Sequence, residues 1–368
     1  MKKRIAVLGA TGSIGKSSID IILRDKKNFD VVLLSSHCKS EELEKLSIIF
    51  PSAKKVLTGG SNGKENLLSA IKDIKPDITI NGISGAAGLM PSIAAIESGS
   101  HLALANKETI VMAGKYVLSL AKEKKINIIP VDSEHSAVFH LLEKEVQDKK
   151  NEKTSEIILT ASGGPFRNYT LQEMENVTAK DALSHPTWNM GPKITIDSAT
   201  MANKGLEVIE ACVLFNMPSS KIKVVIHPQS IVHSMIRLCN GVIYAQMSKP
   251  DMRHPIHDAL YWPVTTPSSL EPISFENLTL EFFKPDMEKF PMLKLAFEAA
   301  KSDALYPCAY NAANEVAAAA FLEQKIKFTD IAKITERVLQ NDWSGSNMNI
   351  ETVLNADKEA RIKANAFI

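Results

Sequence analysis

One segment, residues 185–211, combines residue types that bind ligands with the spacing of a helix. It reads HPTWNMGPKITIDSATMANKGLEVIEA. Asn203 and Lys204 precede Glu207 by four and three residues, so all three side chains share one face if the segment is helical. A lysine and an amide suit a phosphate, and a carboxylate suits a hard metal ion. The alternative is a surface helix with a single Lys–Glu pair.

Two further carboxylates follow a predicted strand. Asp132 and Glu134 come directly after the apolar run INIIPV. In extended chain their side chains point to the same side, and converging carboxylates repel each other unless a cation lies between them. Ligands that are all oxygen favour Mg²⁺ or Mn²⁺ over zinc. The alternative is a helix cap followed by an acidic first turn.

A lysine follows the preceding predicted strand. Asn106, Lys107 and Glu108 come after HLALA and open a helix. Ligands of open α/β sheets bind at the carboxyl ends of the strands. Lys107 could therefore polarise a substrate oxygen and Asn106 could approach a cofactor. A cap with one salt bridge is the alternative.

Small hydrogen-bond donors follow a third predicted strand, EIILT. Ser162 is followed there by two glycines, and hydroxyl and backbone N–H donors suit phosphate. Ser198, Asn203 and Lys204 offer the same chemistry. Together the four residues predict a phosphate site with one cation, as a sugar phosphate needs. A simple turn after the strand is the alternative.

A glycine-rich loop, GATGSIG at residues 9–15, joins the first predicted strand to the first predicted helix. Such glycines let the backbone approach a pyrophosphate at a helix N-terminus. After the second predicted strand the chain carries hydroxyls, His37 and Lys39 where an NAD-specific protein usually has an acid. This composition predicts NADP rather than NAD, with a merely polar surface loop as the alternative.

Two histidines, His227 and His233, lie in VVIHPQSIVHSM. Their even spacing would place them on one face of a strand, but Pro228 interrupts the pattern. We interpret the pair as structural because the carboxylates offer a better site for a hard ion. We expect His233 to lie close to the pocket.

The order of predicted elements divides the chain into four parts. Residues 1–132 alternate strands and helices, which predicts an α/β, Rossmann-like parallel sheet that binds NADPH. Residues 133–261 are predicted to form an α+β catalytic domain with the metal and substrate site. Residues 262–290 are a connector rich in Pro, Ser and Thr, and residues 291–368 are predicted to form an all-α helical domain. In the second part the strands are expected at residues 155–160, 193–196, 223–227 and 242–247, and helices at 171–176 and 201–215.

Composition limits the class of protein. The 368 residues are 45% hydrophobic and 23% charged, which is typical of soluble globular proteins with two or three domains. The net charge of +1, without a basic stripe, argues against nucleic acid as a partner. Four scattered cysteines fit a reducing compartment, and no apolar run reaches the roughly 18 residues of a membrane span. The expected location is cytoplasmic, away from any membrane.

Together the motifs resemble one family, the 1-deoxy-D-xylulose 5-phosphate reductoisomerases. The shared segments span nearly the whole chain in order: GATGSIG (9–15), GAAGL (85–89), ANKE (105–108), PVDSEH (130–135), ASGGPFR (161–167), HPTWNMGPK (185–193), DSATMANKGLEVIEA (197–211), IHPQSIVHSM (226–235), PDMRHPI (250–256) and NAANE (311–315). The resemblance implies NADPH-dependent conversion of 1-deoxy-D-xylulose 5-phosphate to 2-C-methyl-D-erythritol 4-phosphate in the non-mevalonate isoprenoid pathway. A rearrangement of the carbon skeleton precedes hydride transfer. The family also forms homodimers.

The resemblance assigns roles to individual residues. A divalent ion, Mg²⁺, Mn²⁺ or Co²⁺, is expected on Asp132, Glu134 and Glu207. The expected catalytic residues are Lys107, Asp132, Glu134, Glu207 and His185. The expected substrate-binding residues are Lys107, Ser133, Glu134, Ser162, His185, Trp188, Ser198, Asn203 and Lys204, with His185 and Trp188 on a flap at residues 185–193. The expected NADPH contacts are Gly9, Thr11, Gly12, Ser13, Ile14, His37, Lys39, Asn106, Glu108 and Gly191.

One departure and two rival functions remain. The family often has a small residue, a polar or basic residue and Asn after the second strand, whereas this chain has His37, Cys38 and Lys39. A rival enzyme is an NADP-dependent dehydrogenase of another phosphorylated intermediate, which needs no site of three carboxylates. A rival without activity is a nucleotide-sensing or scaffold protein.

Overall fold

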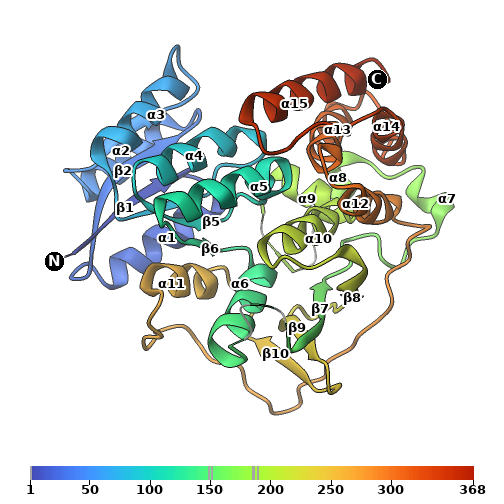
Figure 1. Ribbon diagram of the computed structural model, residues 1–368, viewed down its shortest axis with the longest axis horizontal. Coiled ribbons are helices and arrows are strands. Elements are labelled where there is room, and N and C mark those ends of the chain that lie inside the picture. Colours follow the sequence, from blue (N-terminus) through green and yellow to red (C-terminus); the bar gives the residue numbers. More distant parts are fainter. Residues whose placement is uncertain (1, 148–149, 151, 185–186, 189) are drawn as a thin grey trace. The chain divides into compact units, whose positions relative to one another are not determined.

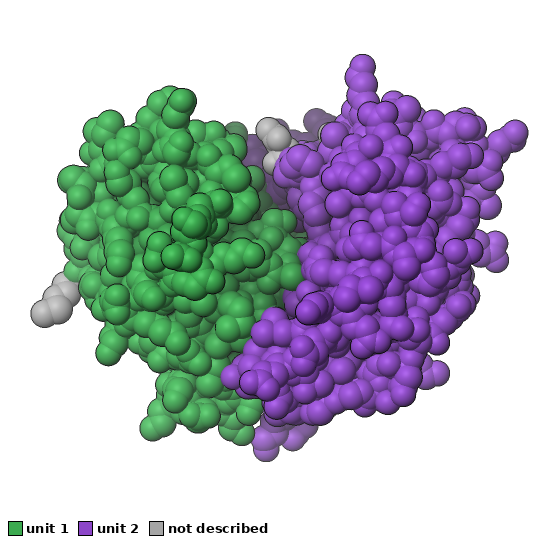
Figure 2. Space-filling model, turned by 90° about the horizontal axis from the view of Figure 1, so that it is seen from above, with its two compact units in different colours: residues 1–109, 117–136, 251–271 green, residues 110–116, 137–250, 272–368 purple. Residues whose placement is uncertain are grey.

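The chain folds into two compact units, shown in different colours in Figure 2. The computed structural model describes residues 2–147, 150, 152–184, 187–188 and 190–368. Unit 1 contains residues 1–109, 117–136 and 251–271, and unit 2 contains residues 110–116, 137–250 and 272–368.

Unit 1 is built on a six-stranded parallel sheet. From edge to edge its strands are β3 (Lys54–Leu57), β2 (Phe29–Ser36), β1 (Lys3–Leu8), β4 (Ile78–Asn81), β5 (His101–Leu104) and β6 (Ile128–Pro130). This 3-2-1-4-5-6 order is that of dinucleotide-binding Rossmann sheets. The central strands are apolar and buried because helices cover parallel sheets on both faces. The predicted Rossmann-like α/β fold is confirmed.

Helices connect these strands (Figure 1). They are α1 (Ser13–Arg24), α2 (Ser40–Ile49), α3 (Gly63–Ile74), the short η1 (Ala86–Gly88), α4 (Leu89–Glu97), α5 (Lys107–Lys124) and α6 (Ser133–His140), the last two beginning in unit 1. A later segment returns to this unit as α11 (Arg253–Tyr261). There the Nζ of Lys3 donates to the carbonyl of Leu260 at 2.9 Å.

Unit 2 contains a mixed four-stranded sheet in the order β10-β9-β7-β8. Strand β7 (Thr154–Ala161) pairs in parallel with β8 (Ile222–Ile226) and antiparallel with β9 (Val232–Leu238), which pairs antiparallel with β10 (Ile243–Met247). The mixed sheet confirms the α+β prediction. Its other short elements are η2 (Leu141–Glu145), α7 (Leu171–Met174), α8 (Ala179–Ala182) and η3 (Ser219–Lys221).

The remaining helices of unit 2 are longer. Helices α9 (Pro192–Ala199) and α10 (Ala202–Leu214) come first, and the C-terminal part is helical, as predicted, with α12 (Pro291–Ser302), α13 (Tyr306–Leu322), α14 (Asp330–Leu339) and α15 (Ile350–Asn365). Alanines line the buried side of α13 and allow its neighbours to pack closely. Gly205 of α10 serves the same purpose, because a Cβ there would lie 2.6 Å from the hydroxyl of Tyr310.

The strand predicted at residues 193–196 is wrong, because these residues lie in α9. Pro192 occupies the first turn of this helix, where its fixed φ is favourable. The hydroxyl of Thr195 donates to the carbonyl of Gly191 at 2.8 Å, and Lys193 pairs with Asp197 one turn later at 2.7 Å. These local contacts outweigh the β-branched composition of the segment.

Among the described residues, no helix is both long and apolar enough to span a bilayer.

Candidate active site

The glycine-rich loop of unit 1 has the tight geometry that its sequence predicts. Gly9 has φ +74°, and a Cβ there would lie 2.8 Å from the carbonyl oxygen of Gly82. A Cβ on Gly15 would lie 2.4 Å from the carbonyl oxygen of Gly9. Helix α1 begins directly after the loop, with Gly12 as an N-cap that offers no side chain. The helix N-terminus is thus open to an anion, as a dinucleotide pyrophosphate requires.

This geometry makes the loop sensitive to one methyl group. We expect Gly15→Ala to weaken NADPH binding by at least about tenfold, because the new Cβ must displace the backbone of the loop. Titration of NADPH by fluorescence measures the effect. Gly60→Ala is the matched control, since nothing lies within 4 Å of a Cβ at that position. Equal affinity in the two variants would contradict a role for the loop.

A cation that the sequence did not predict, Lys16 of α1, lies beside the residues that follow β2. Lys39 pairs with Glu42 at 3.2 Å, and Lys16 of α1 pairs with the same carboxylate at 3.2 Å. These hydrogen bonds lower the pKa of Glu42. His37 contacts the hydroxyl of Thr58 at 3.1 Å. Two lysines thus lie near the end of β2, and lysine side chains suit a 2′-phosphate.

Asn106 and Glu108 fasten the loop between β4 and α4. The side-chain amide of Asn106 donates to the carbonyls of Ile83 and Gly85 at 2.8 and 2.9 Å, and its oxygen accepts from the backbone N–H of Thr109 at 3.1 Å. Glu108 accepts from the backbone N–H of Gly85 at 3.1 Å. The capping alternative is therefore confirmed for Asn106, and its contact with NADPH stays a prediction.

Lys107 and Asp132 form a buried ion pair at the carboxyl ends of β5 and β6. The Nζ of Lys107 lies 2.5 Å from Oδ2 of Asp132, and the two side chains are 5% and 10% exposed. The other oxygen of Asp132 accepts from the backbone N–H of Glu134 at 3.2 Å and contacts Nδ1 of His135 at 3.2 Å. Asp132 thus also caps α6, as the alternative predicts, and its metal binding stays a prediction.

The carboxylate of Glu134 lies near that of Asp132. Each offers an oxygen within 4.8 Å of the other. The hydroxyl of Ser133 donates to Glu134 at 2.5 Å. Two carboxylates this close, with oxygen donors beside them, have the chemistry of a site for a hard divalent ion.

In unit 2, Glu207 is buried at 1% exposure on α10. It accepts from the amide of Asn203 at 2.5 Å and pairs with the ammonium of Lys204. The three side chains share one helix face, as their spacing predicts. Because Lys204 is itself only 3% exposed, its charge and that of Glu207 compensate each other out of water.

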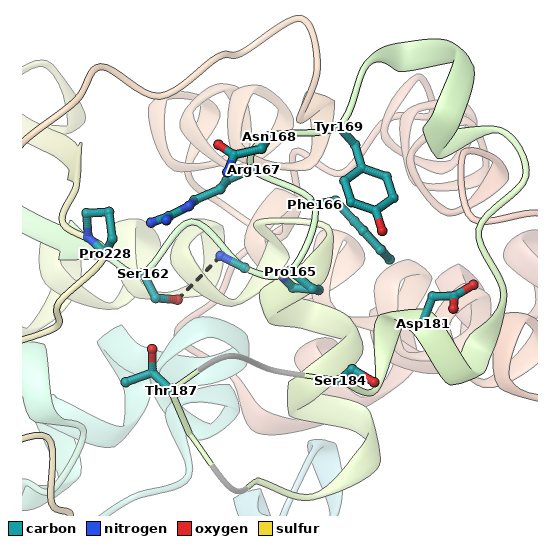
Figure 3. Close-up of a pocket in the computed structure, with 11 residues that line it drawn as sticks. Ser162, Pro165, Phe166, Arg167, Asn168, Tyr169, Asp181, Ser184, Thr187 and Pro228 are labelled. Atoms are coloured by element: carbon teal, nitrogen blue, oxygen red, sulfur yellow. Dashed lines mark hydrogen bonds between the residues drawn. The ribbon is translucent and has the colours of Figure 1, made fainter.

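The loop after β7 packs against the end of α9. Gly163 and Gly164 have φ +86° and +67°, and a Cβ on Gly164 would lie 2.6 Å from the carbonyl oxygen of Ser198. The backbone N–H of Gly164 donates weakly, at 3.4 Å, to the hydroxyl of Ser162 (Figure 3). Unit 2 therefore places the loop that carries Ser162 in direct contact with the end of α9 that carries Ser198.

A pocket of about 420 Å³ opens beside Ser162. Phe166 and Tyr169 form one side of it, with ring centroids 5.0 Å apart, and the Arg167 side chain extends over the loop toward Pro228 (Figure 3). Arg167 is the last residue of the ASGGPFR segment, and the sequence alone did not predict a role for it. Its position three residues after Gly164 was the available signal.

The flap prediction is covered only in part. His185 lies outside the described residues, and Trp188 is half-buried. Gly191 is the N-cap of α9, where its carbonyl accepts from the backbone N–H of Thr195 at 3.1 Å. The cofactor contact of Gly191 stays a prediction.

The structural interpretation of His227 is confirmed. Its Nδ1 donates to the carbonyl of Glu281 at 2.8 Å, and its Nε2 accepts from the backbone N–H groups of Ile231 and Val232 at 3.2 and 3.1 Å. A neutral ring satisfies all three contacts. His233 lies on β9 and contacts the hydroxyl of Ser248 at 2.7 Å.

The fold and the site together indicate a dinucleotide-dependent enzyme. The Rossmann-like sheet fits a dinucleotide through its glycine cradle, the loop of residues 9–15. The clustered carboxylates fit a metal ion, and the Ser162 loop with Ser198 fits a phosphate. The profile of 1-deoxy-D-xylulose 5-phosphate reductoisomerase matches residues 5–58 and 46–114. The profile of its C-terminal domain matches residues 128–215, and a second C-terminal domain profile of the same enzyme matches residues 247–363.

Individual relatives agree over the full length. The 1-deoxy-D-xylulose 5-phosphate reductoisomerase of Pelodictyon phaeoclathratiforme is 46% identical and covers 100% of both chains. That of Treponema denticola is 47% identical over 100% of this chain and 97% of its own. The chain belongs to the 1-deoxy-D-xylulose 5-phosphate reductoisomerase family.

Solved structures of the family have the same fold. The reductoisomerase of Zymomonas mobilis in complex with NADPH is 40% identical, with a TM-score of 0.90 over 100% of this chain and 99% of that one. A reductoisomerase in complex with NADPH, fosmidomycin and magnesium is 37% identical, with a TM-score of 0.93 over 99% and 98%.

Proposed function

We infer that this chain converts 1-deoxy-D-xylulose 5-phosphate to 2-C-methyl-D-erythritol 4-phosphate in the non-mevalonate isoprenoid pathway, using NADPH and a divalent metal ion. The observation that carries this function is the buried Lys107–Asp132 pair beside Glu134 at the carboxyl edge of a Rossmann-like sheet. A simple hydride transfer needs a cofactor cradle, but it does not need clustered carboxylates. Full-length relatives of the same activity and structures with NADPH and magnesium support the inference.

The proposed metal ligands are Asp132, Glu134 and Glu207, with Mg²⁺, Mn²⁺ or Co²⁺ as the ion. Asp132 and Glu134 belong to unit 1 and Glu207 to unit 2. When bound, the ion supplies Lewis-acid polarisation of the substrate oxygens and NADPH supplies the hydride. The donor set fits the ion, because all three side chains are carboxylates.

The chain's own residues bind and orient the substrate. We propose that the ammonium of Lys107, which is paired with Asp132, stabilises negative charge that develops on a substrate oxygen as one carbon–carbon bond breaks and another forms. The hydroxyl of Ser133 and the carboxylate of Glu134 bind neighbouring substrate hydroxyls. These roles, and that of His185, rest on the family resemblance.

The proposed phosphate site consists of Ser162, Ser198, Asn203 and Lys204. The contact between the Ser162 loop and α9 supports it, as does the burial of Lys204 on the adjoining helix. The proposed NADPH contacts are Gly9, Thr11, Gly12, Ser13, Ile14, His37, Lys39, Asn106, Glu108 and Gly191. The glycine cradle supports the first five.

The flap at residues 185–193 is proposed to close over the substrate and exclude water. We expect Trp188→Ala to raise the KM for the sugar phosphate and to slow turnover, because the indole would no longer cover the site. Steady-state kinetics measures both constants. Tyr244→Ala, an exposed aromatic on β10, is the control for loss of a ring. Unchanged kinetics in Trp188→Ala would remove this residue from the flap.

The assembly and cellular location are also proposals. We infer a homodimer, as in the family, in the cytoplasm. The four cysteines are free thiols, two of them exposed, which supports a reducing compartment. The division into residues 1–132, 133–261, 262–290 and 291–368 is kept as a proposal for the domains.

Identification of the product tests the proposed function. The purified protein, NADPH, Mg²⁺ and 1-deoxy-D-xylulose 5-phosphate should give a phosphate ester with a branched carbon skeleton, visible by NMR as a methyl group on a quaternary carbon. A product with an unbranched skeleton would favour the rival dehydrogenase. No consumption of NADPH with any divalent ion would favour the scaffold or sensor.

A further inference from the structure

A buried carboxylate in α9 connects this helix to the C-terminal helices. Asp197 is 1% exposed, and each of its oxygens has a partner. Oδ2 meets the ammonium of Lys193 at 2.7 Å, and Oδ1 accepts from the amide of Asn314 at 2.9 Å. Asn314 lies on α13 and is fully buried. A buried carboxylate is costly unless it is both paired and hydrogen-bonded, so these contacts fix α9 firmly.

Lys193 is the counter-charge of Asp197, because Asn314 and Tyr310, which also lie near the carboxylate, are neutral. Tyr310, one turn before Asn314 on α13, donates its hydroxyl to the carbonyl of Met292 at 3.0 Å. Burial raises the pKa of Tyr310, and the charge of Asp197 raises it further, so Tyr310 remains neutral. The oxygen of the Asn314 amide accepts no hydrogen bond from the described residues. Asp197 is therefore the one polar partner of the Asn314 side chain among the described residues.

The position of α9 matters because Ser198 follows Asp197 directly. The carbonyl of Ser198 is in close contact with Gly164, next to the loop that carries Ser162. The hydroxyl of Ser198 is half-buried and makes no hydrogen bond within the described chain. A shift of about 1 Å in a group that positions a substrate can cost up to about 100-fold in rate.

We propose that Asp197 and Asn314 are positioning residues that hold Ser198 beside Ser162 for the phosphate of the ligand. This rests on the proposed phosphate site. The fastening comes from the C-terminal helices, which otherwise contribute no residue to that site. The NAANE segment thereby acquires a role in ligand binding, through Asp197.

The test is Asn314→Asp in the full-length protein. In this variant a carboxyl group replaces the amide that donates to Asp197 at 2.9 Å, so two carboxyl groups face each other. Like charges at this distance raise the pKa at which the pair loses its last proton, so at low pH one proton is shared and the new carboxyl donates to Asp197 as the amide does. As the pH rises and the proton is lost, the two groups repel and α9 shifts.

The expected result is that the phosphate affinity of Asn314→Asp depends on pH in a way that the wild type does not show. Relative to wild type at the same pH, the Kd for inorganic phosphate and the KM for the sugar phosphate should be near normal at low pH. Both should rise at least about tenfold at high pH. The Kd for NADPH should stay unchanged. Asn314→Ala, which cannot donate at any pH, should raise the Kd for phosphate throughout.

Asn311→Asp is the matched control. Asn311 lies three residues earlier on α13 and is equally buried, but its amide donates to Glu315 at 3.2 Å. A purely structural effect would appear in both variants. Phosphate affinity in Asn314→Asp that follows the wild type, or an equal loss in Asn311→Asp, would overturn the positioning role. If the wild type binds neither phosphate nor the sugar phosphate, the proposed function itself fails, and this proposal with it.

Discussion

Glu207→Gln is expected to abolish metal-dependent turnover while NADPH binding stays near normal. The change keeps the size of the side chain and its contact with Asn203 but removes one of three proposed metal carboxylates. We expect kcat to fall by about 1,000-fold or more, which corresponds to about 4 kcal/mol of transition-state stabilisation. Steady-state kinetics at several Mg²⁺ concentrations measures the loss. The glycine cradle that we propose for NADPH is in unit 1 and is untouched.

A control separates metal loss from destabilisation. Glu207→Gln leaves the buried ammonium of Lys204 without its counter-charge, which by itself destabilises the fold. Glu315→Gln makes the same change at a partly buried ion pair, with Arg361 at 2.6 Å. Both variants should melt earlier, but only Glu207→Gln should lose activity. Wild-type activity in folded Glu207→Gln would remove Glu207 from the metal site.

Lys107→Met is the second change with a large expected effect. Asp132 loses a cation 2.5 Å away, and the substrate loses the ammonium that we propose to stabilise its developing charge. We expect kcat to fall about 100- to 1,000-fold, the range seen when one preorganised donor is removed from an active site. Rapid-mixing measurements of NADPH oxidation would follow the chemical step.

Lys124→Met provides the comparison for Lys107→Met. Lys124 lies at the other end of α5 and forms an exposed ion pair with Glu123. Exposed pairs contribute at most about 1 kcal/mol, so this variant should keep its activity. If Lys107→Met turns over as fast as Lys124→Met, the role of Lys107 in charge stabilisation is excluded.

Local sequence signals were sufficient where the structure is local. The glycine loop follows from glycines placed between a strand and a helix, and the shared face of Asn203, Lys204 and Glu207 follows from helical spacing. The strand predicted at residues 193–196 was wrong, because the β-branched residues there favour strands in general. There the contact of Asp197 with Asn314, 117 residues away, supports the helix.

Long-range contacts also explain what was missed at the site. Nothing near Lys16 in the sequence indicates that it shares Glu42 with Lys39, because Lys16 reaches this carboxylate only when α1 lies beside the first turn of α2. Strand β9 was missed because Pro228 precedes it closely, yet it begins only at Val232 and pairs with β7 and β10. Pairing partners decide such a strand more than its own residues.

The most direct test of the central claim is NADPH oxidation with 1-deoxy-D-xylulose 5-phosphate before and after chelation of divalent ions. The purified protein should consume NADPH with this substrate only when Mg²⁺ or Mn²⁺ is present. Exhaustive chelation should stop the reaction, and added ion should restore it. Undiminished oxidation after chelation would contradict the metal site and favour a simple dehydrogenase.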